Sequence, residues 1–225
     1  MPLLGAAAVA MWWDMAPEPR SEFEHWHSHE HFPERMSVPG FRRGSRWASD
    51  EGGEGVFVLY ELESFGTLTS PDYLGRLNDP TPWSMRMMPH HRKMVRSQCR
   101  VLDSFGGGVA RFMATIRFSP APGGAQALHD HLKCRLAGLP TLPGLTGAHL
   151  LRTETPDAPP TAEQKIRGGD AVADWVLLVS GYDAGAVGKV ATTEFGDEVL
   201  QGAGVLPSSV TARYRLSHTL TPGDL

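Results

Sequence analysis

The chain has 225 residues, of which 41% are hydrophobic, and carries a formal net charge of −4 at pH 7. This length suits one large domain or two of about 110 residues. A slightly acidic chain lacks the basic surface that binds nucleic acid, and no apolar run approaches the roughly 20 residues of a membrane span, so we expect neither partner. Two cysteines, Cys99 and Cys134, are too few for a disulfide framework, which fits a reducing, cytoplasmic location.

The first 108 residues predict the element order β-α-β-β-α-β. Their apolar start lacks a charged leader region, so we interpret it as a strand and not as a signal peptide. Ser21 is a suitable N-cap for the first helix, and Pro39 should end that helix. A glycine-rich acidic turn at 50–55 joins two strands into a hairpin. The predicted elements are strand 6–15, helix 21–36, strand 40–49, strand 56–65, helical segments 70–77 and 85–93, and strand 95–105.

The first predicted helix carries four histidines at alternate positions: His25, His27, His29 and His31. At about 100° per residue, the first and third of these share one side of a helix, and the second and fourth lie roughly opposite. Phe23, Trp26 and Glu30 adjoin the second pair. Because the apolar members of this face should look inward, we expect His27 and Glu30 to be drawn toward the interior. His25 and His29 are expected to be solvated.

The second half of the chain repeats the same order of elements. A shift of 104 residues places Pro39-Gly40-Phe41 on Pro143-Gly144-Leu145. The same shift places His25 on His129 and His27 on His131, so we interpret His129 and His131 as remnants of the repeat. The predicted elements are strand 109–119, helix 124–136, strand 145–154, a long polar loop 155–170, strand 174–182, helix 184–200 and strand 209–220.

This element order is that of a ferredoxin-like unit. We therefore predict an α+β fold made of two tandem ferredoxin-like units, residues 1–108 and residues 109–225. Two such units in one chain can lay sheet against sheet and close a barrel-like core, which would hide most strand edges. The first unit is predicted to be the active one, because it holds the histidine-rich helix.

Several motifs of the first half carry a family resemblance: Trp26, His31, Phe32-Pro33, Pro39-Gly40-Phe41 and Leu59-Tyr60-Glu61. On these residues the chain resembles the dimeric α+β barrel superfamily, and within it the EthD-type proteins. The second half resembles them mainly in element order, and Arg135 stands where His31 would be repeated. The resemblance implies a barrel of the kind that homodimers usually build, formed here within one chain, and leaves a further homodimer open. It implies reactions that range from cofactor-free oxygenation to isomerisation, elimination and decarboxylation, and the superfamily also contains haem enzymes. We expect no cofactor.

His31 and His27 are the catalytic candidates, because imidazole titrates near pH 7 and can both donate and accept protons. Glu30 beside them could orient an imidazole, or act as a base with a raised pKa if it is buried. A metal site is the competing use of these residues, since His27 and His31 are spaced for chelation and Glu30, His90 or His91 would supply a third ligand. No cysteine cluster supports zinc, and we predict no metal.

Four residues are candidates for contact with a substrate: Trp26, Tyr60, Trp83 and Arg46. Trp83 lies in a methionine-rich, proline-broken segment, which would suit a flat apolar ligand. Tyr60 would need a hydrogen-bond partner for its hydroxyl if it is buried. Arg46 could bind a substrate carboxylate, although a solvated strand face is the simpler interpretation.

We therefore predict an enzyme that acts on a small apolar molecule, aromatic or polyketide-like, by histidine general acid–base chemistry of the isomerase or lyase type. A cofactor-free monooxygenase is the first alternative. The others are a non-catalytic binding or stress protein with a hydrophobic pocket, and a metalloenzyme that uses His27 and His31.

Overall fold

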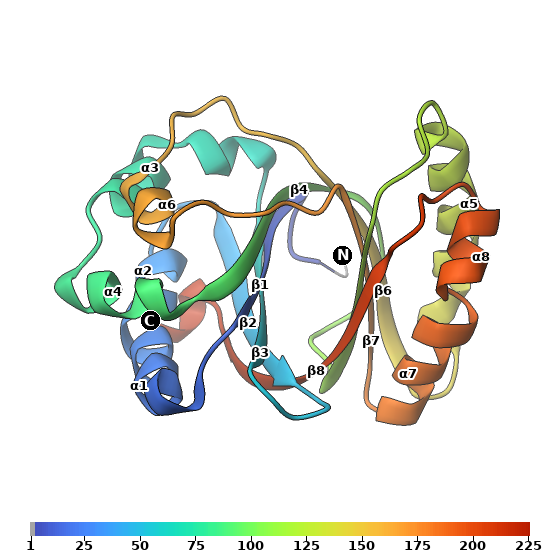
Figure 1. The fold of residues 1–225 in the computed structure, drawn as a ribbon, viewed down its shortest axis with the longest axis horizontal. Coiled ribbons are helices and arrows are strands. Elements are labelled where there is room, and N and C mark those ends of the chain that lie inside the picture. The colour runs from blue at the N-terminus through green and yellow to red at the C-terminus, as the bar shows by residue number, and fades with distance from the viewer. Residues whose placement is uncertain (1–2) are drawn as a thin grey trace.

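Eight antiparallel strands close into a barrel in the computed structural model, which describes residues 3–225. Around the barrel the strands follow the order β1-β3-β2-β8-β5-β7-β6-β4 (Figure 1). Their bounds are β1 (Ala7–Asp14), β2 (Phe41–Ser49), β3 (Gly55–Leu62), β4 (Arg92–Gly106), β5 (Phe112–Phe118), β6 (Leu145–Thr153), β7 (Trp175–Gly181) and β8 (Val210–Leu220). Closure pairs both edges of each of these strands, which protects them from pairing with other chains.

The helices lie outside the barrel in two layers, one on either side (Figure 1). Their bounds are α1 (Pro17–Trp26), the π-helical turn η1 (His27–His31), α2 (Phe32–Met36), α3 (Pro71–Asn78), α4 (Pro82–Met87), α5 (Ala125–Gly138), α6 (Ala162–Arg167), α7 (Ala184–Thr193) and α8 (Asp197–Gly202). Short 3-10 segments occur at Phe65–Thr69, Met88–His90, Leu139–Thr141 and Pro222–Asp224. None of the helices in residues 3–225 is long and apolar enough to cross a membrane.

Each half of the chain contributes four neighbouring strands to the barrel. The first half supplies the order β4-β1-β3-β2 and the second half supplies β8-β5-β7-β6, which is the ferredoxin-like order in both cases. The two sheets join where β2 pairs with β8 and where β4 pairs with β6. The connection between them lies within residues 107–111. The predicted α+β architecture, an intrachain barrel of two ferredoxin-like units, is confirmed.

Alternation along the strands sends every second side chain into the barrel and the others under the helices. The barrel interior packs Trp12, Trp47 and Phe57 of the first half against Leu178 and other apolar residues of the second half. The indole Nε1 of Trp12 donates a hydrogen bond of 3.1 Å to Thr115 Oγ1 on β5. The two halves therefore share one central core, and each has a second core beneath its own helices.

Two glycine turns, one in each half, occupy equivalent places before β2 and β6. Gly40 has a φ of +93° and Gly144 a φ of +89°, a region that side chains with a Cβ rarely adopt. The carbonyl oxygen of Gly40 accepts from the Glu63 amide at 2.7 Å, and that of Gly144 accepts from the Tyr182 amide at 3.0 Å. The same backbone geometry thus recurs at the positions that the sequence repeat aligns.

Three predicted helices have the wrong boundaries. The predicted helical segment 85–93 is α4, which begins at Pro82, followed by a 3-10 turn, and β4 already begins at Arg92. The first helix begins at Pro17 with Ala16 as its N-cap, and Ser21 lies within it, because proline at the first position is already set to a helical φ. The predicted helix 184–200 is divided into α7 and α8. At the division a Cβ on Gly196 would lie only 2.3 Å from the carbonyl oxygen of Thr192, so a glycine is needed for this close approach.

The predicted polar loop 155–170 contains a short helix, α6, that the sequence analysis missed. Its N-cap Thr161 accepts from the Gln164 amide, and the Gln164 side chain accepts from the Thr161 amide, which is a capping box. Gly168 ends the helix in the left-handed conformation. The whole connection between β6 and β7, residues 154–174, crosses from the second half to the helices of the first half (Figure 1). We call it the cover segment.

Candidate functional site

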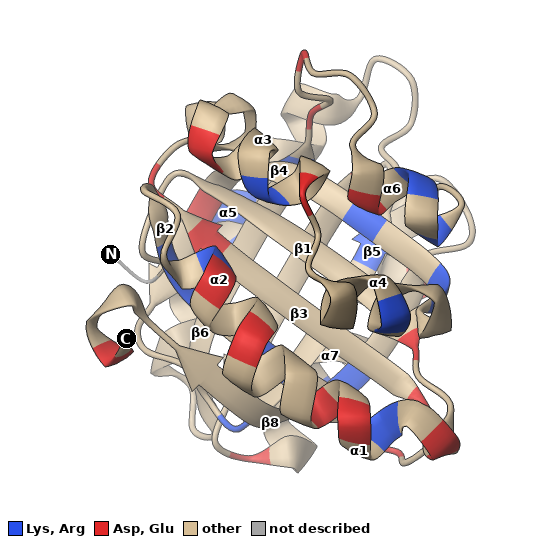
Figure 2. Ribbon diagram, turned by 90° about the vertical axis from the view of Figure 1, so that its left-hand side faces the viewer, with Lys and Arg blue, Asp and Glu red and all other residues tan. Residues whose placement is uncertain are grey.

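A small cavity lies between the outer face of the first-half sheet and the helices that cover it, α1 to α3 and α6. Figure 2 shows these helices from outside, lying across the sheet that contains β1 and β3. We call the cavity the histidine pocket, after the three imidazoles that line it: His27, His31 and His91. Its volume is about 30 Å³, room for one or two water molecules. In this closed form it cannot hold the flat apolar ligand that the sequence predicted.

The π-helical turn places two of these histidines on the inner side of the helix. The Phe32 amide donates to the His27 carbonyl, five residues back, so the turn contains one residue more than an α-helical turn. Pro33 follows at once and has no N–H to continue the ladder. His27 is 1% exposed and His31 is 7% exposed, and their ring centroids are 5.3 Å apart. The inward position predicted for His27 is confirmed.

The other two histidines of the helix face solvent, as predicted. His25 and His29 are exposed, and their rings stack with centroids 4.5 Å apart. The Nδ1 atom of His29 is hydrogen-bonded to the carbonyl of His25 at 3.0 Å. His25 and His29 are histidines of the same helix as the pocket histidines but lie in solvent, so they are matched controls in the experiments below.

The third imidazole, His91, enters the pocket from the segment just before β4. Its ring lies 4.7 Å from that of Trp13 and 6.0 Å from that of Trp26. Both ring nitrogens are buried, and neither has a hydrogen-bond partner among residues 3–225. The sequence analysis did not name His91 among the catalytic candidates, although the buried Met88 and Met94 on either side of it indicate a segment that packs inward.

All three imidazoles are neutral at pH 7. Burial lowers the pKa of His27 and of His31 well below the usual value, and the positive charges of Arg46 and Arg35, respectively, lower them further. Burial and the nearby charge of Arg167 lower the pKa of His91 to about 3. Like both nitrogens of His91, the Nδ1 atoms of His27 and His31 have no hydrogen-bond partner in the part of the chain that the structure describes. Unpaired buried nitrogens are costly, so the pocket is poised for a polar group that the protein does not itself supply.

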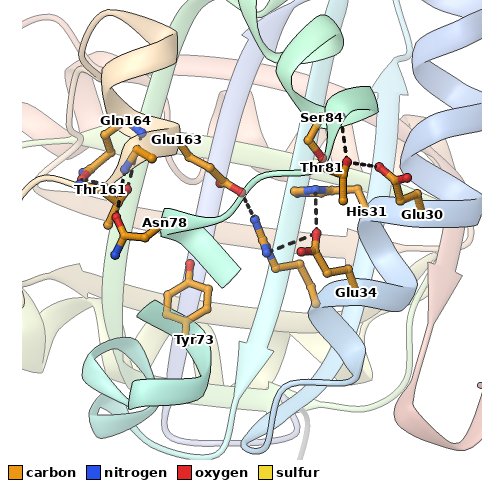
Figure 3. A network of polar contacts seen from close by, with 12 residues as sticks. Glu30, His31, Glu34, Tyr73, Asn78, Thr81, Ser84, Thr161, Glu163 and Gln164 are labelled. Atoms are coloured by element: carbon orange, nitrogen blue, oxygen red, sulfur yellow. Dashed lines mark hydrogen bonds and ion pairs between the residues drawn. The ribbon is translucent and has the colours of Figure 1, made fainter. Parts of the chain in front are cut away.

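Tyr60 and Arg35 are among the further polar side chains that line the pocket. The Tyr60 hydroxyl is buried and has no hydrogen-bond partner among the described residues. Burial raises its pKa well above the usual value, so the phenol is protonated. Arg35 is ion-paired with Glu163 and has its Nη1 atom 3.4 Å from Glu34 Oε2. Glu34 also approaches His31, with 3.8 Å between Oε2 and Nδ1 (Figure 3). The pKa of Glu34 is raised above its usual value, mainly because the carboxylate is partly buried.

The cover segment closes the pocket from the second half of the chain. Glu163 projects from α6 toward the helix that carries His31 and Glu34 (Figure 3). Within the segment, Arg167 lies 3.5 Å from Glu163 and 2.9 Å from Asp170. These ionic side chains are at most 6% exposed. A buried network of this kind fixes geometry more than it adds stability, because each charge is taken out of water.

Of the predicted site residues, His27, His31, Trp26 and Tyr60 line the pocket. The sequence analysis missed Arg35, Arg96 and the cover-segment residues Glu163 and Arg167, which also line it. Arg35 stands one turn after His31, and that spacing was an available signal. The cover-segment residues are more than 120 positions away from the helix.

Glu30, Trp83 and Arg46 are not part of the lining. Glu30 accepts hydrogen bonds from Trp26 Nε1 at 3.1 Å and from Thr81 Oγ1 at 2.5 Å, so it fixes the indole and the start of α4 (Figure 3). Trp83 is half-buried on the outer surface, where it donates to Glu22. Arg46 lies beneath α1, where it donates to Ser28 Oγ at 3.1 Å. These three residues therefore lie around the pocket but do not line it.

Metal ligation is not supported by the geometry. In residues 3–225, no three His, Cys, Asp or Glu side chains are arranged so that they could hold a metal ion. His129, on the equivalent helix of the second half, has its Nε2 atom hydrogen-bonded to Asp103 Oδ2 at 2.5 Å. The arrangement instead offers neutral imidazoles that can accept a proton and, in Arg35 and Tyr60, groups that can stabilise a nearby anion.

The comparisons with known proteins bear on the fold. Neither a protein-family model nor a curated protein matches the sequence. An anthrone oxidase-like protein of known structure is 14% identical, with a TM-score of 0.66 over 97% of this chain and 94% of that one. A candidate monooxygenase from Fusobacterium nucleatum is 6% identical, with a TM-score of 0.63 over 99% and 98% of the two chains.

A candidate monooxygenase from Lactobacillus acidophilus is 12% identical, with a TM-score of 0.60 over 98% of both chains. These likenesses show the fold, a closed α+β barrel of two ferredoxin-like units. The resemblance to EthD-type proteins stays at the level of sequence motifs, since no family model matches. This chain supplies both halves of the barrel itself, so the barrel does not require a second chain. A homodimer of the chain therefore remains a prediction.

Proposed function

We propose that the chain is an enzyme that transfers a proton on a small, largely apolar molecule bound at the histidine pocket, with His31 as the acid–base group. The observation that carries the proposal is the set of buried, neutral imidazoles with unpartnered nitrogens beside an aromatic wall. The His31 ring lies 4.6 Å from that of Trp26 and is approached by Glu34. A neutral imidazole accepts a proton, and Trp26 offers a flat surface to an aromatic substrate.

The low pKa of the imidazoles restricts which substrates fit the proposal. A buried imidazole with a lowered pKa is a weak base, so the carbon that loses its proton must be acidic. The anion that forms would itself raise the pKa of the protonated His31 by attraction between opposite charges. The protonated Tyr60 and the cationic Arg35 would stabilise that anion further. His27, with its ring 5.3 Å from that of His31, is assigned a supporting role.

The closed pocket requires a movement before such a molecule binds. A volume of about 30 Å³ is far below the 300 Å³ or more of ordinary ligand sites. Since α6 closes the pocket by contacts that cross between the two halves, displacement of the cover segment is the motion we assign to substrate entry. Such lid movements also exclude water once they close over a substrate.

Cofactor-free oxygenation is the second candidate function, and the anthrone oxidase-like and monooxygenase-type structural neighbours favour it. It begins with the same removal of a proton from carbon. In anthrone, the methylene group between two aryl rings would then be oxidised to a carbonyl by O2, with one oxygen atom retained and the other released as water. The isomerase or lyase reaction stops at the proton transfer and the rearrangement of the anion.

One experiment separates these candidates with anthrone as the probe. Proton NMR in D2O without oxygen measures deuterium exchange at the methylene group, and oxygen uptake in air measures oxidation. We expect the protein to accelerate exchange, and His31→Gln to slow it by about 100-fold or more. His25→Gln, an exposed histidine of the same helix, is the matched control and should exchange at the original rate.

Three outcomes count against the proposal. Unchanged exchange in folded His31→Gln would remove this residue from the mechanism. Binding of anthrone without any exchange would favour a non-catalytic carrier. Activity that is lost on treatment with a chelator and restored by a metal would favour a metalloenzyme. Oxygen uptake in addition to exchange would assign the second candidate function.

A further inference from the structure

Arg96 on β4 is a buried cation whose charge the protein does not neutralise. The residue is 7% exposed, and within the described part of the chain its side chain has one hydrogen bond, from Nη2 to the Tyr73 hydroxyl at 3.1 Å. In residues 3–225 no carboxylate lies within ion-pairing distance of it, whereas the neighbouring Arg35 and Arg167 each have two. Charged side chains are seldom buried without a partner, because removing them from water is costly.

Arg96 stands where two hollows meet. One is the histidine pocket, and the other, which we call the outer groove, has a volume of about 400 Å³ and lies between the cover segment and strands β4 and β6. Arg96 lines both of them. Glu163 and Arg167 of α6 face the pocket, while Gln164 and Lys165 of the same helix face the groove. The helix α6 therefore separates the two hollows, and its displacement would join them around Arg96.

The acids of the groove are already paired with other residues. Glu154 accepts from Arg100 and from Arg152, each at 2.6 Å. Asp170 accepts from Arg167 at 2.9 Å and 3.1 Å. Lys165, which also lines the groove, makes no ion pair within residues 3–225. The groove consequently offers unneutralised positive charge at Arg96 and Lys165.

We propose that the outer groove binds the carboxylate of a small aromatic acid through Arg96, with the ring of the acid directed toward the histidine pocket. The planar guanidinium matches a carboxylate by two parallel hydrogen bonds. The aromatic and methionine side chains of the pocket, among them Trp13, Trp26 and Met88, suit the apolar part of the same molecule. This inference rests on the proposed function, in that it names the class of molecule that the same pocket takes.

The test compares a carboxylic acid with its neutral amide. Calorimetric titration measures the affinity for 2-naphthoate and for 2-naphthamide, which differ mainly in charge. We expect the acid to bind at least about tenfold more tightly than the amide, because charge-assisted hydrogen bonds to a buried guanidinium are the distinguishing contacts. Arg96→Gln should remove this preference, and Arg96→Lys, which keeps the charge but loses the paired geometry, should retain part of it.

Arg111→Gln is the control, because Arg111 is an exposed arginine outside the groove. It should bind 2-naphthoate as the original protein does. If Arg96→Gln does not fold, the guanidinium N–H resonances of the original protein are followed by NMR during the titration. A change at the resonance of Arg96 then supports the proposal, and resonances that do not change oppose it.

Equal affinities for acid and amide, or full affinity in folded Arg96→Gln, would overturn the carboxylate assignment. That result leaves the proton-transfer proposal intact, because anthrone carries no carboxylate and its exchange is measured independently. Conversely, 2-naphthoate that binds through Arg96 in a protein inactive on anthrone would support the groove and oppose the proposed reaction on that substrate.

Discussion

The Arg35 guanidinium and the Glu163 carboxylate form a buried ion pair that joins residues 128 positions apart in the chain. Arg35 belongs to the histidine-bearing helix of the first half, and Glu163 belongs to the cover segment of the second half. The two side chains are 3% and 5% exposed. This pair is the direct ionic link between the site and its cover.

Glu163→Gln should loosen the cover segment without unfolding the barrel. The substitution removes a buried carboxylate that Arg35 and Arg167 share, but Arg35 keeps Glu34 and Arg167 keeps Asp170 as partners, so the cost should be below the about 3–5 kcal/mol of a buried charge left without any partner. Because α6 is a short helix within a long connection, we expect this cost to appear as local opening. Hydrogen exchange followed by mass spectrometry should show faster exchange in residues 154–174 and unchanged exchange in the strands. Asp157→Asn, an exposed acid in the same segment, is the control. Equal protection in the variant and the original protein would show that the pair does not hold the segment.

The stability of the protein should fall as the pH drops below about 6.5, the pKa of histidine in an unfolded chain. The folded-state pKa values of His27, His31 and His91 are lowered, so the unfolded state binds more protons in this range. The loss should continue toward pH 3, near the folded-state pKa of about 3 for His91. Urea unfolding at pH 7.5 and at pH 5 measures the difference.

His91→Phe should reduce this pH dependence. Phenylalanine fills similar space against Trp13 and Phe23 and has no nitrogens to leave unpartnered. We therefore expect stability at pH 7.5 equal to or above that of the original protein, and a smaller loss at pH 5. His90→Gln, at the exposed neighbouring position, should keep the original pH dependence. If His91→Phe keeps the pH dependence of the original protein, protonation of His91 on unfolding does not contribute to that dependence.

Thr115→Val should destabilise the whole barrel, since Thr115 on β5 accepts the hydrogen bond of the buried Trp12 indole on β1. The substitution keeps the shape of the side chain but leaves the indole N–H without a partner, which costs about 1–3 kcal/mol. Thr115→Ser keeps the hydroxyl and should lose only the contribution of the methyl group. The free energy of unfolding from urea titration distinguishes the two variants. If the valine variant is no less stable than the serine variant, the hydrogen bond makes no net contribution.

Gly40→Ala and Gly75→Ala should change stability in opposite directions. At Gly40, φ is +93° and an added Cβ would lie 2.5 Å from Thr67 Oγ1, so the alanine variant is strained and crowded. Gly75 lies within α3 with open space around it, and alanine there should stabilise the helix by about 0.5–1 kcal/mol. Thermal unfolding of both variants provides the measurement. A stabilised Gly40→Ala protein would contradict the assigned turn geometry.

Much of the architecture could be predicted from local sequence patterns. The alternation in the strands, the Pro-Gly turns before β2 and β6, and the matching order of the two halves together specify a pair of ferredoxin-like sheets. The face of the first helix was also predictable, because Phe23 and Trp26 are apolar at helical spacing and carry His27 inward with them. Such signals arise from contacts between residues a few positions apart, which a single sequence displays.

The shape of the helix around His31 was harder to predict. A regular α-helix from Ser21 was expected, whereas the helix starts at Pro17 and contains a π-helical turn before Pro33. Proline fixes its own φ and lacks an N–H, but whether the preceding turn widens or kinks depends on what packs against it. The capping pattern Thr161-x-x-Gln164 could have indicated α6.

The sequence by itself determined the order of the elements, the turns that join them and the inward face of the histidine-bearing helix, because each depends on backbone geometry and side-chain spacing within a few residues. Only the tertiary structure decided that α6 of the second half closes over that face, that His91 joins the other two imidazoles, and that Arg96 is left without a carboxylate. These relationships depend on which distant segments share a low-dielectric interior, and the energies that select them are absent from any local stretch of the chain.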